Sequence, residues 1–276
     1  MRLIRHIVFW MVVVLLVGCQ VIPEGERILP LPNAEPQSNS LLIDFTGFLC
    51  VNCPTAAADA ELLHQRYPEN LVVVAMHPAD NHFTQTTLPQ YDYTCPEANI
   101  YYNYFGGSGT TPFPTGIIDF VSEWSAYSDW ASLVRSSVMK EKPGHVDIAL
   151  SNLRPKTREF AFSLVVSADS TLETQALLWL VADSVQGAQQ MPDGSSNLSY
   201  THRHMLRASV LENPWGWDFT LTAGADAIHT RILDYQITDT IGGEALPLER
   251  YSLVAVMLDK RTKELLDVKQ IKIKNE

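Results

Sequence analysis

The feature that most constrains the fold is a Cys-x-x-Cys motif, Cys50-Val-Asn-Cys53, which lies between two segments of different character. The apolar run 41–45 before it predicts a strand, and the alanine-rich stretch 54–67 after it predicts a helix. The motif therefore opens a helix, where unpaired backbone N–H groups and the helix dipole stabilise a thiolate. We expect Cys50 to be the exposed, acidic thiol and Cys53 to be shielded behind it, placed to attack a mixed disulfide formed at Cys50.

Two other interpretations of the cysteine pair are a zinc half-site and an inert structural disulfide. A zinc site needs about four ligands, usually as two such pairs. Only Cys95 and scattered histidines remain, so we expect neither a metal nor a cofactor. The inert disulfide stays open.

Two further signals accompany the motif. Asp44 lies six residues before Cys50 on the predicted strand, and Phe113-Pro114-Thr115 precedes a second apolar run. With these signals, residues 40–142 resemble the thioredoxin superfamily. The resemblance implies an α/β thioredoxin-like domain with Cys50 as nucleophile, Cys53 as resolving thiol and a Cys50–Cys53 disulfide. It also implies that the buried carboxylate of Asp44 assists Cys53 and that Pro114 is a cis proline that faces the dithiol and presents backbone to a substrate.

One position departs from that pattern. The active thiol-disulfide oxidoreductases commonly carry Trp before the first cysteine, whereas this chain has Leu49. The motif is therefore stronger evidence for the fold than for turnover.

The N-terminus has the layout of a signal peptide over residues 1–18. A basic start precedes the apolar run 7–17, which is too short to cross a bilayer. The run ends in Val17-Gly18-Cys19, which resembles the bacterial lipobox, in which the cysteine is acylated. This implies a lipid anchor at Cys19, and Gln20 after it favours the outer membrane, on either its periplasmic or its surface side.

The segment 19–39 contains four prolines and few bulky residues, so we expect an extended tether. Removal of the signal peptide leaves 18 basic against 31 acidic residues, a formal charge of −13. A charge of this sign argues against nucleic acid or an anionic membrane surface as a partner.

The hydrophobic period changes from helical to alternating at Lys142-Pro143-Gly144, where we expect a domain boundary. Short alternating strands with Asn, Gly, Pro and Asp between them predict an all-β, immunoglobulin-like antiparallel sandwich over 145–276. The expected strands are 146–150, 159–166, 176–182, 204–210, 218–222, 230–237, 252–258 and 268–273.

Each of four further side chains has two possible roles. Cys95 near a predicted helix start is either a resolving cysteine or, as we favour, an unpaired buried residue. His77 after the apolar run 71–76 either shuttles protons or simply belongs to a loop, which we favour. His202 and His204 share one face of a predicted strand, where a two-histidine metal site is conceivable, but without a third ligand we prefer a structural role.

The order of these motifs, with Trp215-Gly216 in the second half, resembles the twenty-eight-kilodalton outer-membrane lipoprotein family of Bacteroidetes. That resemblance covers residue 41 to the end and implies an outer-membrane lipoprotein, without an assigned reaction. Two functions remain open. One is thiol-disulfide exchange on exported proteins. The other is a non-catalytic surface binding protein or adhesin, with a structural disulfide and surface ligands as partners.

Overall fold

The computed structural model describes residues 35–121, 123–222 and 229–274. The expected signal peptide 1–18, Cys19 and most of the tether 19–39 lie outside the described residues. From Pro36 onward the described residues form one compact unit.

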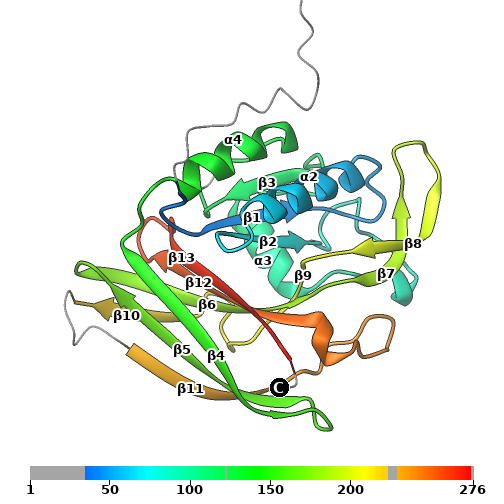
Figure 1. Ribbon diagram of the computed structural model, residues 1–276. Helices are drawn as coiled ribbons and strands as arrows, with labels where there is room; N and C mark the ends of the chain where they lie inside the picture. Colours follow the sequence, from blue (N-terminus) through cyan, green and yellow to red (C-terminus); the bar gives the residue numbers. More distant parts are fainter. Residues whose placement is uncertain (1–34, 122, 223–228, 275–276) are drawn as a thin grey trace, which may run out of the picture. The chain divides into compact units, whose positions relative to one another are not determined.

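The first part of this unit alternates strands and helices. β1 is parallel to β2 and antiparallel to β3, and α2 and α4 lie on the same side of these strands (Figure 1). The elements are β1 (Ser40–Phe45), α2 (Cys53–Arg66), β2 (Leu71–Met76), the 3-10 turn η2 (Pro89–Tyr91), α3 (Pro96–Tyr104), β3 (Thr115–Ile118) and α4 (Tyr127–Val138). The helix expected at 54–67 is present as α2, with each end within one residue of the expected position. After β3, an isolated bridge pairs Gly116 with Ser125.

The second part consists of strands and one 3-10 turn. They are β4 (Gly144–Arg154), β5 (Glu159–Ala168), β6 (Leu172–Ala182), β7 (Val185–Gln190), β8 (Ser196–His202), β9 (Met205–Ser209), β10 (Trp217–Leu221), β11 (His229–Gln236), η3 (Leu248–Arg250), β12 (Tyr251–Asp259) and β13 (Leu265–Lys272). All eight expected strands occur. The hairpin β7–β8 was not expected, because its polar sequence lacks apolar alternation.

One mixed sheet runs through both parts, in the order β13-β12-β6-β9-β2-β1-β3. The link is a parallel pairing of β2 with β9, where the Ala75 N–H donates to the carbonyl of His204 at 2.7 Å. The outer edge of β2 needs partners for its backbone groups, and the segment that leads into β9 supplies one at Ala75. The chain positions 142–145, where we expected a domain boundary, therefore do not divide the sheet.

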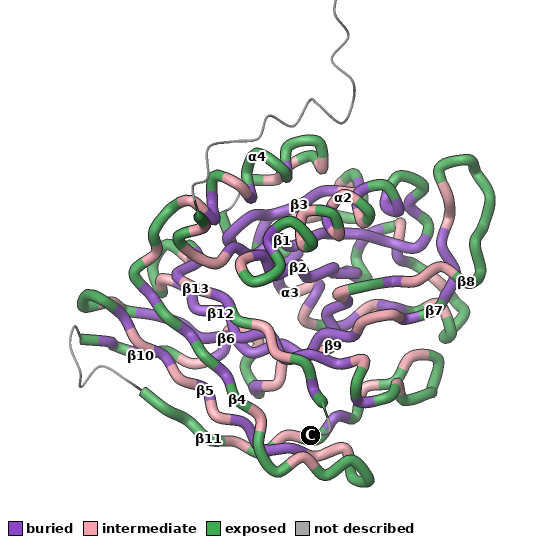
Figure 2. Tube along the Cα trace, viewed as in Figure 1, coloured by how far each residue is buried: buried purple, intermediate pink, exposed green. Residues whose placement is uncertain are grey.

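Both faces of this sheet are covered. Along β6, Leu177, Trp179 and Val181 join a cluster with the first part of the chain, whereas Leu178 and Leu180 pack with β5. The antiparallel sheet β11-β5-β4 covers this second face. Figure 2 shows the result, with β6 and β12 buried and the tips of β8 and β11 exposed. The described fold is thus mostly β, built from one mixed and two antiparallel sheets.

Candidate functional site

Cys50 and Cys53 form a disulfide at the start of α2, with their Cα atoms 5.4 Å apart. Both residues are buried, with 1% of Cys50 and 2% of Cys53 exposed. In the disulfide form neither cysteine is exposed, and the expectation that Cys50 is the exposed thiol of the reduced protein stays a prediction. Its neighbours on the turn, Leu49 and Val51, are exposed instead.

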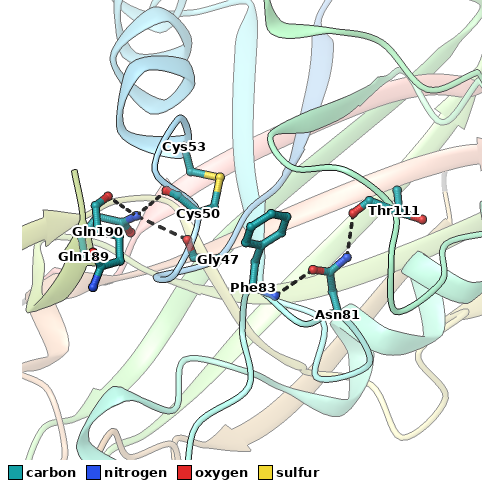
Figure 3. The surroundings of a disulfide bond; sticks show 8 residues. All are labelled: Gly47, Cys50, Cys53, Asn81, Phe83, Thr111, Gln189 and Gln190. Carbon is teal, nitrogen blue, oxygen red and sulfur yellow. Dashed lines mark hydrogen bonds between the residues drawn. A yellow bond between two sulfur atoms is a disulfide. The ribbon is translucent and has the colours of Figure 1, made fainter. Parts of the chain in front are cut away.

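Contacts from distant segments cover the turn before Cys50 (Figure 3). The Leu49 N–H donates to the carbonyl of Phe83 at 3.0 Å. Gly47 is required here, because a Cβ atom at this position would lie 2.5 Å from that same carbonyl oxygen. From β7, the Gln189 side-chain amide donates to the carbonyl of Cys50 at 2.9 Å. The hairpin that the sequence did not predict therefore fixes the cysteine turn.

Asn81 connects the loop that carries Phe83 to the loop before Pro114. Its Nδ2 donates to the carbonyl of Thr111 at 2.9 Å, and its Oδ1 accepts from the Phe83 N–H at 3.0 Å (Figure 3). Asn81 is fully buried. Its amide thus holds together two loops that flank the disulfide.

The peptide bond before Pro114 is cis, as the sequence resemblance implies. The β1–β3 register pairs Phe45 with Thr115, so Pro114 lies beside the end of β1, where the cysteine turn begins. Phe113 belongs to the same buried cluster as Cys50 and Cys53. The fold therefore brings the proline loop and the disulfide together at one end of β1.

Asp44 lies on β1 and is 3% exposed. Its Oδ1 has no hydrogen-bond partner among the described residues. Burial disfavours the charged form and raises the pKa of Asp44 to about 7. A carboxyl group with this pKa exchanges protons readily near neutral pH.

Asp44 and Cys53 line one cavity of about 370 Å³, between α2 and the segment that joins β8 to β9. Three histidines, His77, His202 and His204, line its walls. His77 is 3% exposed and its Nδ1 has no partner among the described residues. Nε2 of His202 donates to the carbonyl of Ala188 at 3.2 Å. Burial lowers the pKa of His202 to about 4 and that of His77 well below its usual value, so both rings are neutral at pH 7.

The expectation that His202 and His204 share one face of a strand is wrong. β8 ends at His202, and His204 has a positive φ of 56° in the turn to β9. Its Nε2 lies 3.3 Å from Glu61 at the surface. His77 is the ring near His202, at 6.1 Å between ring centroids. Sequence spacing could not reveal this pair, because β2 and the β8–β9 turn are brought together only by the sheet.

Cys95 is buried at the start of α3, and its Sγ donates to the carbonyl of Leu206 at 3.4 Å. Burial raises the pKa of Cys95 to about 12. The thiol is therefore protonated and covered, as expected for the structural alternative.

No group of three or more metal-ligating side chains occurs in the described parts of the chain. Within residues 35–121, 123–222 and 229–274, no helix is long and apolar enough to span a bilayer.

Comparison with known proteins gives structural likenesses only. No protein-family model and no curated protein sequence matches the chain. HBP35 of Porphyromonas gingivalis superposes with a TM-score of 0.63 at 13% identity, over 87% of this chain and 76% of that protein. A protein of Agrobacterium tumefaciens gives a TM-score of 0.51 at 10% identity, over 88% and 98% of the two chains.

A domain of the outer membrane lipoprotein Omp28 from Porphyromonas gingivalis shares 18% identity over 48% of this chain and 88% of that domain. Its TM-score of 0.34 is too low to carry an argument. At these identities, the likeness to HBP35 and the Agrobacterium protein shows a shared fold and nothing about activity.

Proposed function

We propose that the protein is a lipid-anchored thiol-disulfide oxidoreductase of the outer membrane, with a thioredoxin-like part joined to a β-sandwich-like part. The observation that carries the proposal is the disulfide at the start of α2 beside the buried Asp44, whose Oδ1 has no partner among the described residues and which lines the same cavity as Cys53. The loop of Pro114, which lies beside the end of β1 where the cysteine turn begins, supports it.

In the proposed reaction, reduced Cys50 attacks a disulfide of an exported protein and forms a mixed disulfide. Cys53 then transfers its proton to Asp44 and attacks Cys50, which releases the substrate as a dithiol and restores the Cys50–Cys53 disulfide. Asp44 suits this role because a pKa of about 7 makes it a competent proton acceptor near neutral pH. Pro114 offers backbone groups to the extended chain of the substrate.

A second candidate function is a surface binding protein in which the disulfide is structural. The burial of both cysteines and the hydrogen bond from Gln189 to Cys50 favour it.

The reduction potential of the Cys50–Cys53 pair decides between these functions. Catalytic pairs lie between about −120 and −270 mV, whereas structural disulfides lie below about −300 mV. We expect a potential in the catalytic range with slow turnover of a generic disulfide, because Leu49 replaces the aromatic residue that commonly precedes the nucleophile. Titration of the mature protein against dithiothreitol or glutathione buffers measures it. A potential below the structural threshold would leave only the binding function.

The anchor and the location rest on the N-terminal sequence. The Cys19→Ala variant should lose both the acyl mass and its association with the membrane fraction. If the variant still sediments with outer membranes and carries the same added mass, the lipid anchor at Cys19 is wrong.

A further inference from the structure

The cavity between α2 and the β8–β9 turn has features that the proposed exchange on exported proteins does not explain. It reaches the disulfide at Cys53, whereas Cys50 is absent from its described lining. Two of its lining residues that are at least nine-tenths buried, Asp44 and His77, each have a buried polar atom without a partner among the described residues. Unpaired buried polar atoms cost free energy unless a ligand or water satisfies them. These two side chains therefore place unmet hydrogen-bonding capacity beside the cavity.

The mouth of the cavity carries opposite charges. The Glu61 carboxylate lies 3.3 Å from Nε2 of His204 and 4.0 Å from Nε of Arg203. The hydrogen bond with His204 lowers the pKa of Glu61 to about 2, so its charge is present at any physiological pH. Arg203 is half exposed, and its Nη1 also lies 3.9 Å from Asp183. Both of its ion pairs are long and reach solvent, so a ligand carboxylate can replace one of them. An occupant with one ammonium and one carboxylate group would match this pair.

We propose that this cavity admits a small thiol bearing ammonium and carboxylate groups, of which cysteine is the simplest, and that the thiol reduces the disulfide by attack on Cys53. This inference deepens the proposed function, on which it rests, by naming the reductant class and its entry site. A cavity of about 370 Å³ accommodates such a molecule but not a folded protein.

The chemistry favours attack at this sulfur. When the small thiolate attacks Sγ of Cys53, its S–S bond to Cys50 breaks and Cys50 leaves as a thiolate. A leaving thiolate of lower pKa departs faster, and the N-terminal end of α2 stabilises Cys50 in that form. Asp44 takes the proton of the incoming thiol. A second small thiol then attacks the mixed disulfide at Cys53, so two thiols become one small disulfide and the protein gains a dithiol.

Single-cysteine variants test which sulfur faces the entry site. In a Cys19→Ala, Cys95→Ser background, Cys50→Ser leaves only Cys53, and Cys53→Ser leaves only Cys50. Each variant is reacted with L-cystine, and formation of the mixed disulfide is followed by mass spectrometry. We expect the Cys53 thiol to react at least 10-fold faster than the Cys50 thiol. The reverse order would overturn the proposal.

Two further variants test the cavity itself. Ala57→Phe fills it from α2 and should slow the reaction of Cys53 with L-cystine about 10-fold, whereas Ala131→Phe on the exposed face of α4 should change nothing. Arg203→Gln should lower the rate with L-cystine about fivefold but leave the rate with neutral 2-hydroxyethyl disulfide unchanged. An equal loss with both disulfides, or none with either, would contradict recognition of the charged groups.

The reduction potential separates this inference from the proposed function. If the potential lies in the catalytic range and Cys53 does not react preferentially, only the entry site is wrong. If the potential is that of a structural disulfide, the oxidoreductase itself is wrong.

Discussion

The starts of α2 and α3 are alike in sequence and opposite in chemistry. Each has a proline in its first turn and a cysteine at or beside its N-cap. Cys53 at α2 lines a cavity together with Asp44, whereas Cys95 at α3 is covered by β9. A helix dipole stabilises a nearby charge by at most about 2 kcal/mol. The rise in the pKa of Cys95 from 9.0 to about 12 corresponds to about 4 kcal/mol. Burial of Cys95 therefore outweighs the helix dipole at the start of α3. Cys53 is also buried, so the two helix starts differ in the cavity that Cys53 lines and not in exposure.

The largest expected effect is the difference in thiol reactivity between the two helix starts. With its pKa near 12, Cys95 should react with iodoacetamide at pH 8 about 10³-fold more slowly than an ordinary thiol. In the reduced protein, Cys50 or Cys53 should be modified first. Peptide mapping over time gives the order, and unfolding in urea should abolish the difference. If native Cys95 is labelled as fast as an ordinary thiol, the starts of α2 and α3 do not differ in thiol reactivity.

The next effect concerns Asp44, the group that makes the α2 site chemically distinct. Its pKa is raised from 3.8 to about 7 in the folded protein, so the unfolded chain loses its proton first as the pH rises. Folding stability should therefore fall between about pH 4 and 7 by up to about 4 kcal/mol. Asp44→Asn removes this penalty. It should raise the free energy of unfolding at pH 8 and change little at pH 4.

A matched carboxyl group should respond in the opposite direction. The side chain of Asp239 is only 10% exposed, but it pairs with Arg207 at 3.0 Å and accepts from the Tyr251 hydroxyl at 2.9 Å. Asp239→Asn should therefore destabilise the protein in urea unfolding at pH 8. If both Asn variants change stability in the same direction, the unpaired state of Asp44 is not what sets its pKa.

A smaller effect of opposite pH dependence comes from His202 in the same cavity. Its pKa is lowered from 6.5 to about 4, so the unfolded chain binds a proton first as the pH falls. The protein should lose about 3 kcal/mol of stability between about pH 6.5 and 4 through this group. His202→Gln, which keeps an amide donor for the carbonyl of Ala188, should flatten this loss in urea titrations. If the variant loses as much free energy of unfolding between about pH 6.5 and 4 as the parent protein, the His202 ring is accessible to solvent and becomes charged in the folded protein.

The sequence predicted elements well wherever a local pattern coincided with burial. The apolar run before Cys50 and the alternating strands of the second half each bury one or both faces, so their periods are visible. The cis bond at Pro114 and the buried carboxyl group of Asp44 agree with the resemblance that the motif spacing implied. Asp44 and Pro114 both lie within the first 80 residues of the described chain, on the same part of the sequence as the Cys-x-x-Cys motif.

The sequence could not predict the contacts between the two halves of the chain. The pairing of β2 with β9 depends on a single register position, Ala75 with Met205, which leaves no pattern along the chain. The cavity combines Asp44 and His77 with His202, which lies more than 100 residues further on. The hairpin β7–β8 has a largely polar sequence, and its contacts to the cysteine turn, such as the hydrogen bond from Gln189 to Cys50, join it to the first part of the chain.

The smallest effect tests that hairpin directly. Gln189 donates to the carbonyl oxygens of Cys50 at 2.9 Å and Gly47 at 3.4 Å, and it is buried. Gln189→Ala leaves these acceptors without their donor and should lower the free energy of unfolding by about 1–2 kcal/mol. It should also speed reduction of the disulfide by dithiothreitol severalfold, because the cysteine turn loses its cover. On the exposed side of the same strand, Gln186 bonds Thr201 in contact with solvent, so Gln186→Ala should change both quantities little. If the two variants have equal effects, β7 stabilises the protein as a whole and Gln189 has no special role at the cysteine turn. The access of a reductant to the α2 disulfide would then depend only on the cavity beside Cys53.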